Sequence, residues 1–516
     1  MCTPTPRNTA FVTNVHPHAR ERDIRHECPP QRPGTQHSSR MCTPTPRNAA
    51  FVTNVHPHAP ERGIRHECAL PRPGTQHSSR MSTPTPGNAT FVTNVAGRRD
   101  RRRPAGRTGD GGESGRPAAA LARLPWVRQR RLPTPTTRTD RSTIMGWRTK
   151  NLTTATAGAP LAVYKPTAWL FAQFTRHVVF QGFTPAGGDD GQLYELYCSA
   201  SDDWNVKNLV SEAGGAEAAT NANGYVWAHQ GSQHVVYQGR QFDGHVHELW
   251  YTEDDGWNAN DLTDAAHAPL TLSQPYGYET YYDGTQRVVY HARGGGHIHE
   301  LSNSGHGWHD LDLTAATGAP PCSPDAAPTG YSFEDQRTAH VLVRSDPGHL
   351  LEFWADAAGW HWGDLTATTG APPATDADTV NGYVFRGDGT QHVDYVGVDG
   401  HLHELWWRTD GWHHNDLTAA AGAALPYPTS SPAGYAFESG LFQPVATQHV
   451  VYTGTDDLVH ELWWSSGAWH VNDIAARVGA PPAVGDPVAF VEVDEGTQNV
   501  FYLSDAHQII ELRWTP

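Results

Sequence analysis

The stretch GTQHVDYVGVDGHLHELWWRTDGWHHNDLT, residues 389–418, contains the pattern that decides the fold. Short apolar and aromatic runs alternate with polar residues, and Asp399-Gly400 is a strong signal for a hairpin turn. Together with residues 382–385, the stretch predicts four strands, at 382–385, 391–395, 401–407 and 412–418. Four short strands joined by tight turns within about 50 residues are typical of one β-propeller blade.

This unit occurs seven times in the second part of the chain. Its most regular feature is a glutamate followed by Leu or Phe, at Glu195, Glu248, Glu300, Glu352, Glu404, Glu461 and Glu511. The chain stops after the third strand of the seventh unit, and residues 147–153 read as the missing fourth strand. We therefore predict an all-β fold, a seven-bladed propeller over residues 145–516, in which the N- and C-terminal strands complete one blade.

The first 144 residues differ from the rest. Residues 1–40 and 41–80 are near copies, and a third copy begins at Met81. No helix or strand period is present, so we predict a disordered, Arg- and Pro-rich segment. Its cysteines do not have the close spacing of zinc modules, and we expect no metal and no cofactor. Because Met145 begins the ordered part, we hypothesise that translation starts there; an intact mass near 56.5 kDa would contradict this.

Charge and hydropathy exclude several classes of function. Residues 1–144 have 24 basic and 9 acidic residues, a net charge of +15, and residues 145–516 have 14 and 45, a net charge of −31; the sum is −16. A body this acidic is not expected to bind nucleic acid through its phosphates. No apolar run reaches membrane-spanning length, and no secretory signal is present. We expect a cytoplasmic protein, or one released by a non-classical route; a homo-oligomer is left open.

The repeated glutamate is the most informative residue for function. It lies between apolar neighbours on a strand, so its carboxylate must be hydrogen-bonded or reach a cleft. Two interpretations stand side by side: a latch to the adjacent blade, or an acceptor for a ligand between blades. An aromatic residue follows two positions later at Tyr197, Trp250, Trp354, Trp406 and Trp463. A ring beside a carboxylate suits a sugar, whereas packing in the core explains the ring equally well.

The triplet His-x-His precedes the glutamate in three units, at His245/His247, His297/His299 and His401/His403. Residues two apart on a strand share a face, so each pair is able to ligate a metal. The sequence offers no third ligand, and the other four units break the pair. We therefore favour histidines that hydrogen-bond on the face of a blade.

The unit of residues 389–418 resembles the repeat of fucose-binding propeller lectins, a family with six-bladed fungal and seven-bladed bacterial members. The resemblance covers residues 145–516, and seven units favour the bacterial branch. It implies sugar sites in clefts between blades, in which Glu and Arg bind hydroxyls and an aromatic ring packs on the sugar. The glutamate and ring carry over onto Glu248/Trp250, Glu352/Trp354, Glu404/Trp406 and Glu461/Trp463.

The arginine of this resemblance falls at His234, His340, His392 and His449. Only Arg287, and Arg176 one place away, are able to fill that role. Imidazole does not reproduce the bidentate fork of a guanidinium, so the sequence predicts glycan binding more firmly than fucose itself.

We predict a multivalent lectin for fucose-like or related glycans, and not an enzyme, because the polar residues are copied around the ring and no blade has a carboxylate cluster of its own. A scaffold for protein interactions is the alternative, and a glycan-active enzyme is a weaker one.

Overall fold

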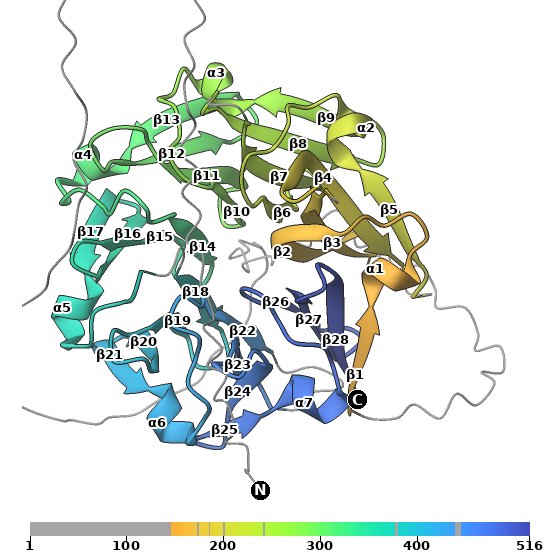
Figure 1. Cartoon of the computed structure of the whole chain (residues 1–516). Helices are drawn as coiled ribbons and strands as arrows, with labels where there is room; N and C mark the ends of the chain where they lie inside the picture. The colour runs from red at the N-terminus through yellow and green to blue at the C-terminus, as the bar shows by residue number, and fades with distance from the viewer. Residues whose placement is uncertain are drawn as a thin grey trace, which may run out of the picture. The chain divides into compact units, whose positions relative to one another are not determined.

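The computed structural model describes residues 146–516 except 173–174, 185, 200–201, 241–242, 377–379 and 439–444. The segment predicted to be disordered, residues 1–144, and the proposed start at Met145 lie outside these residues. The described part forms seven four-stranded antiparallel sheets arranged in a ring (Figure 1). This confirms the predicted seven-bladed propeller.

Six blades are continuous in sequence, and each runs from an inner to an outer strand. The first three are β2(Ala162–Phe171) β3(Thr175–Phe183) β4(Asp189–Cys198) β5(Trp204–Asn208), β6(Asn223–Trp227) β7(Ser232–Gln238) β8(Val246–Thr252) β9(Gly256–Asp261), and β10(Tyr276–Thr280) β11(Thr285–His291) β12(Ile298–Asn303) β13(Trp308–Asp312). The next three are β14(Thr329–Phe333) β15(Thr338–Ser345) β16(His349–Asp356) β17(Gly359–Asp364), β18(Asn381–Phe385) β19(Thr390–Val396) β20(Leu402–Arg408) β21(Gly411–Asp416), and β22(Ala433–Phe437) β23(Thr447–Thr453) β24(Val459–Ser465) β25(Ala468–Asn472).

The seventh blade joins both ends of the described chain. It consists of β26(Val488–Glu492), β27(Thr497–Leu503) and β28(Ile509–Thr515), with β1(Gly146–Asn151) as the outer strand. The pairing is antiparallel and places Thr149 opposite Leu512. The ring is thus closed by hydrogen bonds between the first and last strands, as the sequence predicted.

The predicted fourth strands are too long at their C-terminal ends. β21 ends at Asp416, and the next residues form the short helix α6 instead of continuing the strand to Thr418. The cause is local: the carboxylate of Asp416 accepts the backbone N–H of Ala419 at 2.9 Å, which caps the helix. Residues 152 and 153 likewise belong to a helix and not to the first strand.

A helix of this kind follows the outer strand of every blade. The seven are α1(Leu152–Ala155), α2(Leu209–Ala213), α3(Leu262–Ala266), α4(Leu313–Thr317), α5(Leu365–Thr369), α6(Leu417–Ala421) and α7(Ile474–Val478). Within the described residues, none of these helices is long and apolar enough to cross a membrane.

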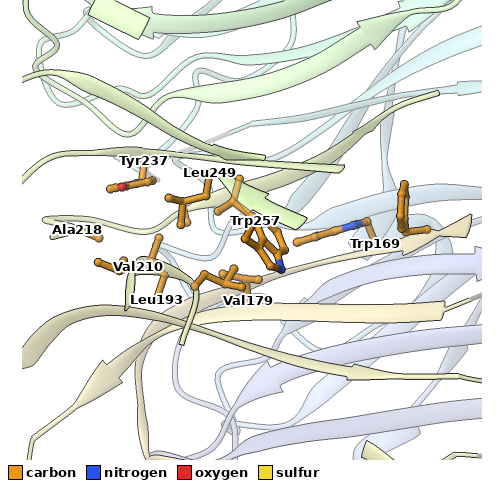
Figure 2. Packing of buried hydrophobic residues seen from close by; sticks show 12 residues of the cluster. Trp169, Val179, Leu193, Val210, Ala218, Tyr237, Leu249 and Trp257 are labelled. Atoms are coloured by element: carbon orange, nitrogen blue, oxygen red, sulfur yellow. The ribbon is translucent and has the colours of Figure 1, made fainter. Parts of the chain in front are cut away.

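The core lies between neighbouring blades. Figure 2 shows Val179 and Leu193 of one blade packing with Tyr237, Leu249 and Trp257 of the next. All five are at most 8% exposed. Both faces of a sheet are covered in this way, so each blade depends on two neighbours for its apolar contacts.

Glycines on the inner strands allow the blades to approach one another. A Cβ on Gly277 would overlap the ring of Tyr225 from the preceding blade, and a Cβ on Gly330 would overlap the ring of Tyr278 in the same way. Each glycine therefore makes room for an aromatic ring that crosses from one blade to the next.

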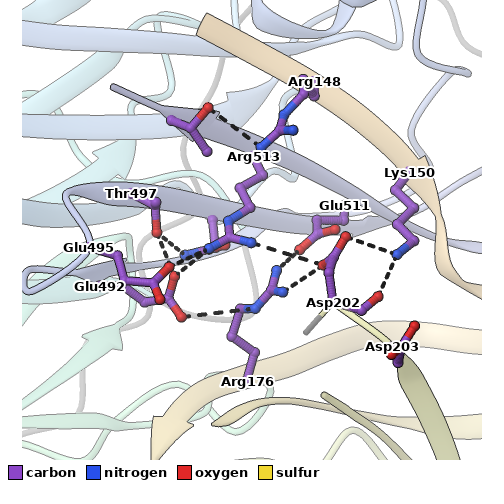
Figure 3. Close-up of polar contacts among 12 residues, drawn as sticks. Arg148, Lys150, Arg176, Asp202, Asp203, Glu492, Glu495, Thr497, Glu511 and Arg513 are labelled. Atoms are coloured by element: carbon purple, nitrogen blue, oxygen red, sulfur yellow. Dashed lines mark hydrogen bonds and ion pairs between the residues drawn. The ribbon is translucent and has the colours of Figure 1, made fainter. Parts of the chain in front are cut away.

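An ionic cluster fastens the closing blade to the blade that follows it (Figure 3). Arg176 on β3 is 1% exposed, and its Nη1 lies 2.5 Å from Oε1 of Glu511 on β28. Its Nη2 lies 2.6 Å from Oδ1 of Asp202. Arg513 binds Glu492 at 2.9 Å within the closing blade. These pairs compensate the carboxylates of Glu511 and Glu492, which are both buried.

We expect Arg176→Met to destabilise the propeller by about 3 to 5 kcal/mol, because it leaves Glu511 buried without its guanidinium partner. Urea unfolding of the full chain measures this loss. Arg148→Met removes a cation from the exposed side of β1 and is the matched control, with little expected effect. Equal losses for the two variants would contradict the proposed role of Arg176 in closing the ring.

Candidate functional site

Five of the blades bring a glutamate, a histidine and an aromatic ring together. In the blade β18–β21, Glu404 lies on the third strand and His392 on the second, with Nδ1 and Oε1 2.7 Å apart. Trp406 is the register partner of His392. The other histidine nitrogen lies 2.7 Å from the hydroxyl of Thr390. Glu404 is 1% exposed, and this chain of bonds supplies the partner that its burial requires.

The same geometry is present in four other blades. The Nδ1–Oε1 distances are 2.7 Å for His177–Glu195, 2.8 Å for His234–Glu248, 2.8 Å for His340–Glu352 and 2.9 Å for His449–Glu461. The structure therefore brings together the four predicted groups of Glu, His and Trp, and it adds a fifth built on Glu195.

The second carboxylate oxygen distinguishes two kinds of blade. An asparagine on the outer strand donates to it in three blades, from Asn260 to Glu248 at 2.9 Å, from Asn415 to Glu404 at 2.7 Å and from Asn472 to Glu461 at 3.0 Å. The residue facing Glu195 is instead Lys207, and the one facing Glu352 is Gly363. Among the described residues, no side chain donates to Oε2 of Glu195 or of Glu352.

Contacts from the next blade also reach the glutamate. Nε2 of Gln286 donates to Oε1 of Glu248 at 2.6 Å, and Nε2 of Gln448 donates to Oε1 of Glu404 at 3.3 Å. Burial raises the pKa of Glu248, but the bonds from His234, Asn260 and Gln286 outweigh it, and the pKa lies below its ordinary value. In these blades the glutamate makes the latch contacts that the sequence left as one of two interpretations.

The two arginines lie in different positions. Arg287 binds Glu300 at 2.8 Å in its own blade. Its register partner is Ser302, where other blades have an aromatic residue. Arg287 therefore does not contact any of the four predicted glutamates. Arg176 reaches the preceding blade instead, and His177 is the partner of Glu195. His177 was not predicted as a site residue, although Thr-x-His recurs at Thr175–His177, Thr338–His340, Thr390–His392 and Thr447–His449.

The predicted aromatic rings are half-buried. Trp406 stacks on His413 with ring centroids 4.2 Å apart, and Trp463 stacks on His470 at 4.4 Å. Trp354 stacks on His361, with ring centroids 5.3 Å apart. The indole N–H of Trp406 is buried without a hydrogen-bond partner among the described residues. One face of each of these rings is thus covered by an outer-strand histidine.

A cavity of about 220 Å³ lies between the blades β2–β5 and β6–β9. One wall carries His177, Glu195 and Tyr197, and the facing wall carries Tyr251 and Trp257. The rings of Tyr251 and Trp257 are 5.6 Å apart. This interblade cleft combines the carboxylate group of one blade with an aromatic wall from the next. Its volume, below the roughly 300 to 1,000 Å³ of drug-sized pockets, suits one small ring.

The aromatic wall of this cleft was not predicted. Its signal lies in the pairs Trp250-Tyr251, Trp406-Trp407 and Trp463-Trp464, whose members point to opposite faces of the strand. The first member lies beside its own glutamate, whereas Tyr251 and Trp464 contact Phe171 and Phe385 of the preceding blade. The blade that the second aromatic residue contacts depends on the order of the blades around the ring.

The His-x-His pairs hydrogen-bond to aspartates. His401 lies 2.8 Å from Asp416, and His403 lies 2.9 Å from Asp399. The same holds for His245 and Asp261, at 2.7 Å. Among the described residues, the one group with metal-like spacing is His245, Asp261 and Asp264, and the side chain of Asp264 is 78% exposed. These contacts agree with the hydrogen-bonding interpretation of the pairs.

No family model matches the chain, and no curated protein matches it. The chain is similar to fucose-binding propeller lectins of known structure. The six-bladed fucose-recognising lectin of Aleuria aurantia shares 15% identity, with 55% of this chain and 87% of that chain covered and a TM-score of 0.37.

Two further structures show the range of the similarity. AofleA from Arthrobotrys oligospora shares 14% identity, covers 64% of this chain and 89% of its own, and has a TM-score of 0.43. A Hadza microbial sialidase shares 11% identity, covers 69% of this chain and 66% of its own, and has a TM-score of 0.40.

One blade carries an additional buried carboxyl group. Asp394 on β19 is fully buried opposite Glu404, and neither of its carboxylate oxygens has a partner among the described residues. The other blades have an apolar residue at this position, namely Val179, Val236, Val289, Leu342, Val451 and Phe501. Burial, and then the charge of Glu404, raise the pKa of Asp394 well above its ordinary value.

We expect Asp394→Val to stabilise the protein by roughly 1 to 3 kcal/mol at neutral pH, since it removes a buried acid without partners. An acid whose pKa is higher in the folded than in the unfolded state lowers stability as the pH rises above its unfolded pKa, about 4. The gain should therefore grow with pH, as measured by thermal unfolding between pH 4 and 8. Asp394→Asn should remove the pH dependence of stability that Asp394 causes, without the additional gain of Asp394→Val. If the gain of Asp394→Val did not change with pH, Asp394 would not have a raised pKa in the folded state.

Proposed function

We propose that this protein is a multivalent carbohydrate-binding protein, with sites in the clefts between neighbouring blades. The observation that supports this most directly is the cleft that joins His177, Glu195 and Tyr197 to Tyr251 and Trp257. Aromatic rings pack on the C–H faces of a sugar, while a carboxylate accepts bonds from its hydroxyls. The cleft offers both kinds of contact within one sugar-sized space.

The free oxygen of Glu195 supports a polar contact at this cleft. His177 binds Oε1, and no described side chain donates to Oε2. A sugar hydroxyl donating to Oε2 would complete the hydrogen bonding of the carboxylate. Glu352 has the same free oxygen beside Trp354, and we propose it as a second binding group of this type.

We also propose sugar sites at the other predicted clefts. Glu248, Glu404 and Glu461 carry their rings Trp250, Trp406 and Trp463, but an asparagine holds the second oxygen, so ligand contact there rests more on the aromatic surface. Arg287 with Glu300 offers a guanidinium without an adjacent ring. Several weak and similar sites on one ring favour avidity on a glycosylated surface.

We propose fucose-like or related glycans as ligands, and binding without catalysis. Five of the repeated carboxylates are held by a histidine of their own blade in nearly the same geometry. Catalytic sites instead combine a few groups with unequal roles at one place.

A glycan array with the full chain tests the proposal, and calorimetry with a bound glycan then counts the sites. We expect more than one site per chain, and Tyr251→Ala should reduce the count by one, because it removes the aromatic wall of the Glu195 cleft. Trp406→Ala should act in the same way on its own cleft. Tyr281→Ala is the matched control, since Tyr281 is 55% exposed and does not line the Glu195 cleft.

Other outcomes would overturn this function. If the folded protein bound no glycan on the array, a protein-interaction scaffold would be the better interpretation. If sugar hydrolysis products appeared in the supernatant, the protein would be a glycan-active enzyme. If the aromatic variants kept their full number of sites, the clefts would be wrongly assigned.

A further inference from the structure

The interblade cleft at Glu195 contains a lysine that the sugar contacts described above leave unused. Lys207 on β5 lines this cleft of about 220 Å³ together with Glu195 and Tyr197. It is the register partner of Glu195. Three other blades carry an asparagine at the same position, namely Asn260, Asn415 and Asn472. The blade β2–β5 thus has a cation in place of a neutral amide at the wall of a proposed sugar site.

Lysine is rare in this chain, which has only Lys150, Lys165 and Lys207. The ammonium groups of the first two lie 3.1 Å and 3.8 Å from the carboxylates of aspartates. Lys207 forms no ion pair with any residue that the structure describes, although the net charge of residues 145–516 is −31. In so acidic a protein, an ammonium group without a carboxylate partner is free to pair with an anionic group of a ligand.

The ring of Tyr197 positions this ammonium group. Nζ of Lys207 lies 5.5 Å from the centroid of the ring, within the range of a cation–π contact. An outer-strand histidine covers the corresponding ring in three other blades, those of Trp354, Trp406 and Trp463. Here that strand position is Asn205, whose amide donates to the backbone carbonyl of Asp203. Lys207 therefore lies over a ring that lines the cleft, on the strand next to the glutamate.

Lys207 and Glu195 offer opposite hydrogen-bonding chemistry to a ligand. The ammonium group only donates, whereas the carboxylate only accepts. His177 already binds Oε1 of Glu195, and no described side chain donates to Oε2. A ligand that satisfies both groups needs an acceptor for Lys207 and a hydroxyl donor for Glu195. A carboxylate is a stronger acceptor for an ammonium group than a neutral hydroxyl, because both partners of the hydrogen bond are then charged.

A second carboxylate, that of Glu253, also lines the cleft. Glu253 is exposed, so water and salt screen its charge. It disfavours an acidic ligand, whereas Lys207 favours one. An amino sugar would instead place its ammonium group near that of Lys207. The two side chains thus act in opposite directions on an acidic sugar, and changing each in turn separates their effects.

We propose that the Glu195 cleft selects a hexuronic acid, a sugar whose terminal carbon is a carboxylate, and that Lys207 determines this specificity. The sugar carboxylate pairs with the ammonium group of Lys207, and a hydroxyl donates to Oε2 of Glu195. The sugar ring packs on the aromatic wall of Tyr251 and Trp257. The volume of the cleft suits one sugar ring, which favours a hexuronic acid over a larger acidic sugar. This inference rests on the sugar site proposed at this cleft.

Calorimetric titration of the full chain with the methyl glycosides of glucuronic and galacturonic acid, and with those of glucose and galactose, tests the proposal. We expect at least one uronide to bind one site at least about tenfold more tightly than its neutral counterpart, because it adds a charge-assisted contact. Lys207→Met should abolish this preference and leave the binding of the neutral sugar largely unchanged, whereas Lys207→Arg should keep the preference. Glu253→Gln should strengthen the binding of the uronide, and added salt should weaken it.

Lys165→Met is the matched control, because Lys165 does not line this cleft. An equal loss of preference in this control would mean that uronides respond to the overall charge, and would overturn the role of Lys207. Equal affinities of the unmodified protein for acidic and neutral sugars, or tighter binding of methyl glucosaminide, would overturn the proposal as well. If Tyr251→Ala weakened the binding of neutral sugars while no uronide preference existed, the sugar cleft would stand and only this inference would fail. Absence of binding by any sugar would overturn both.

Discussion

The whole ring depends on the pairing of β1 with β28. A blade of four short strands buries both of its faces only against its neighbours, so an open ring would leave two blades each with one apolar face exposed. Pairing Thr149 with Leu512 places the last missing strand on the last blade and leaves no partial sheet. Arg176 of the next blade then binds Glu511 of the closing blade, and Lys150 on β1 binds Asp202 of that next blade.

The repeated glutamate shows how one residue serves both the fold and the proposed function. A carboxylate between two apolar residues is costly to bury, and the structure compensates it with a histidine from the adjacent strand. Where an outer-strand asparagine takes the second oxygen, as in Glu404, the group is closed within the protein. Where the outer strand offers Lys207 or Gly363, that oxygen remains for a ligand. The residue opposite the glutamate on the outer strand thus separates a fully bonded carboxylate from a candidate binding group.

The structure shows where the net charge of −31 on residues 145–516 lies. Much of it lies in aspartates that cap short helices or bind histidines, as Asp416 does with His401 and Ala419. These charges are used locally and carry no information about a partner.

The sequence by itself determined the number of blades, their strands and the closure of the ring, because each unit repeats the same turns and the same alternation of faces. It also indicated that Glu, His and Trp occur together in the same units, and in the structure these residues lie side by side. Only the tertiary structure decided that Trp257 and Tyr251 face Glu195, and that Arg176 belongs to the closing contact. These contacts join residues from different blades or separate loops, and their distances depend on how the blades pack, which no local pattern encodes.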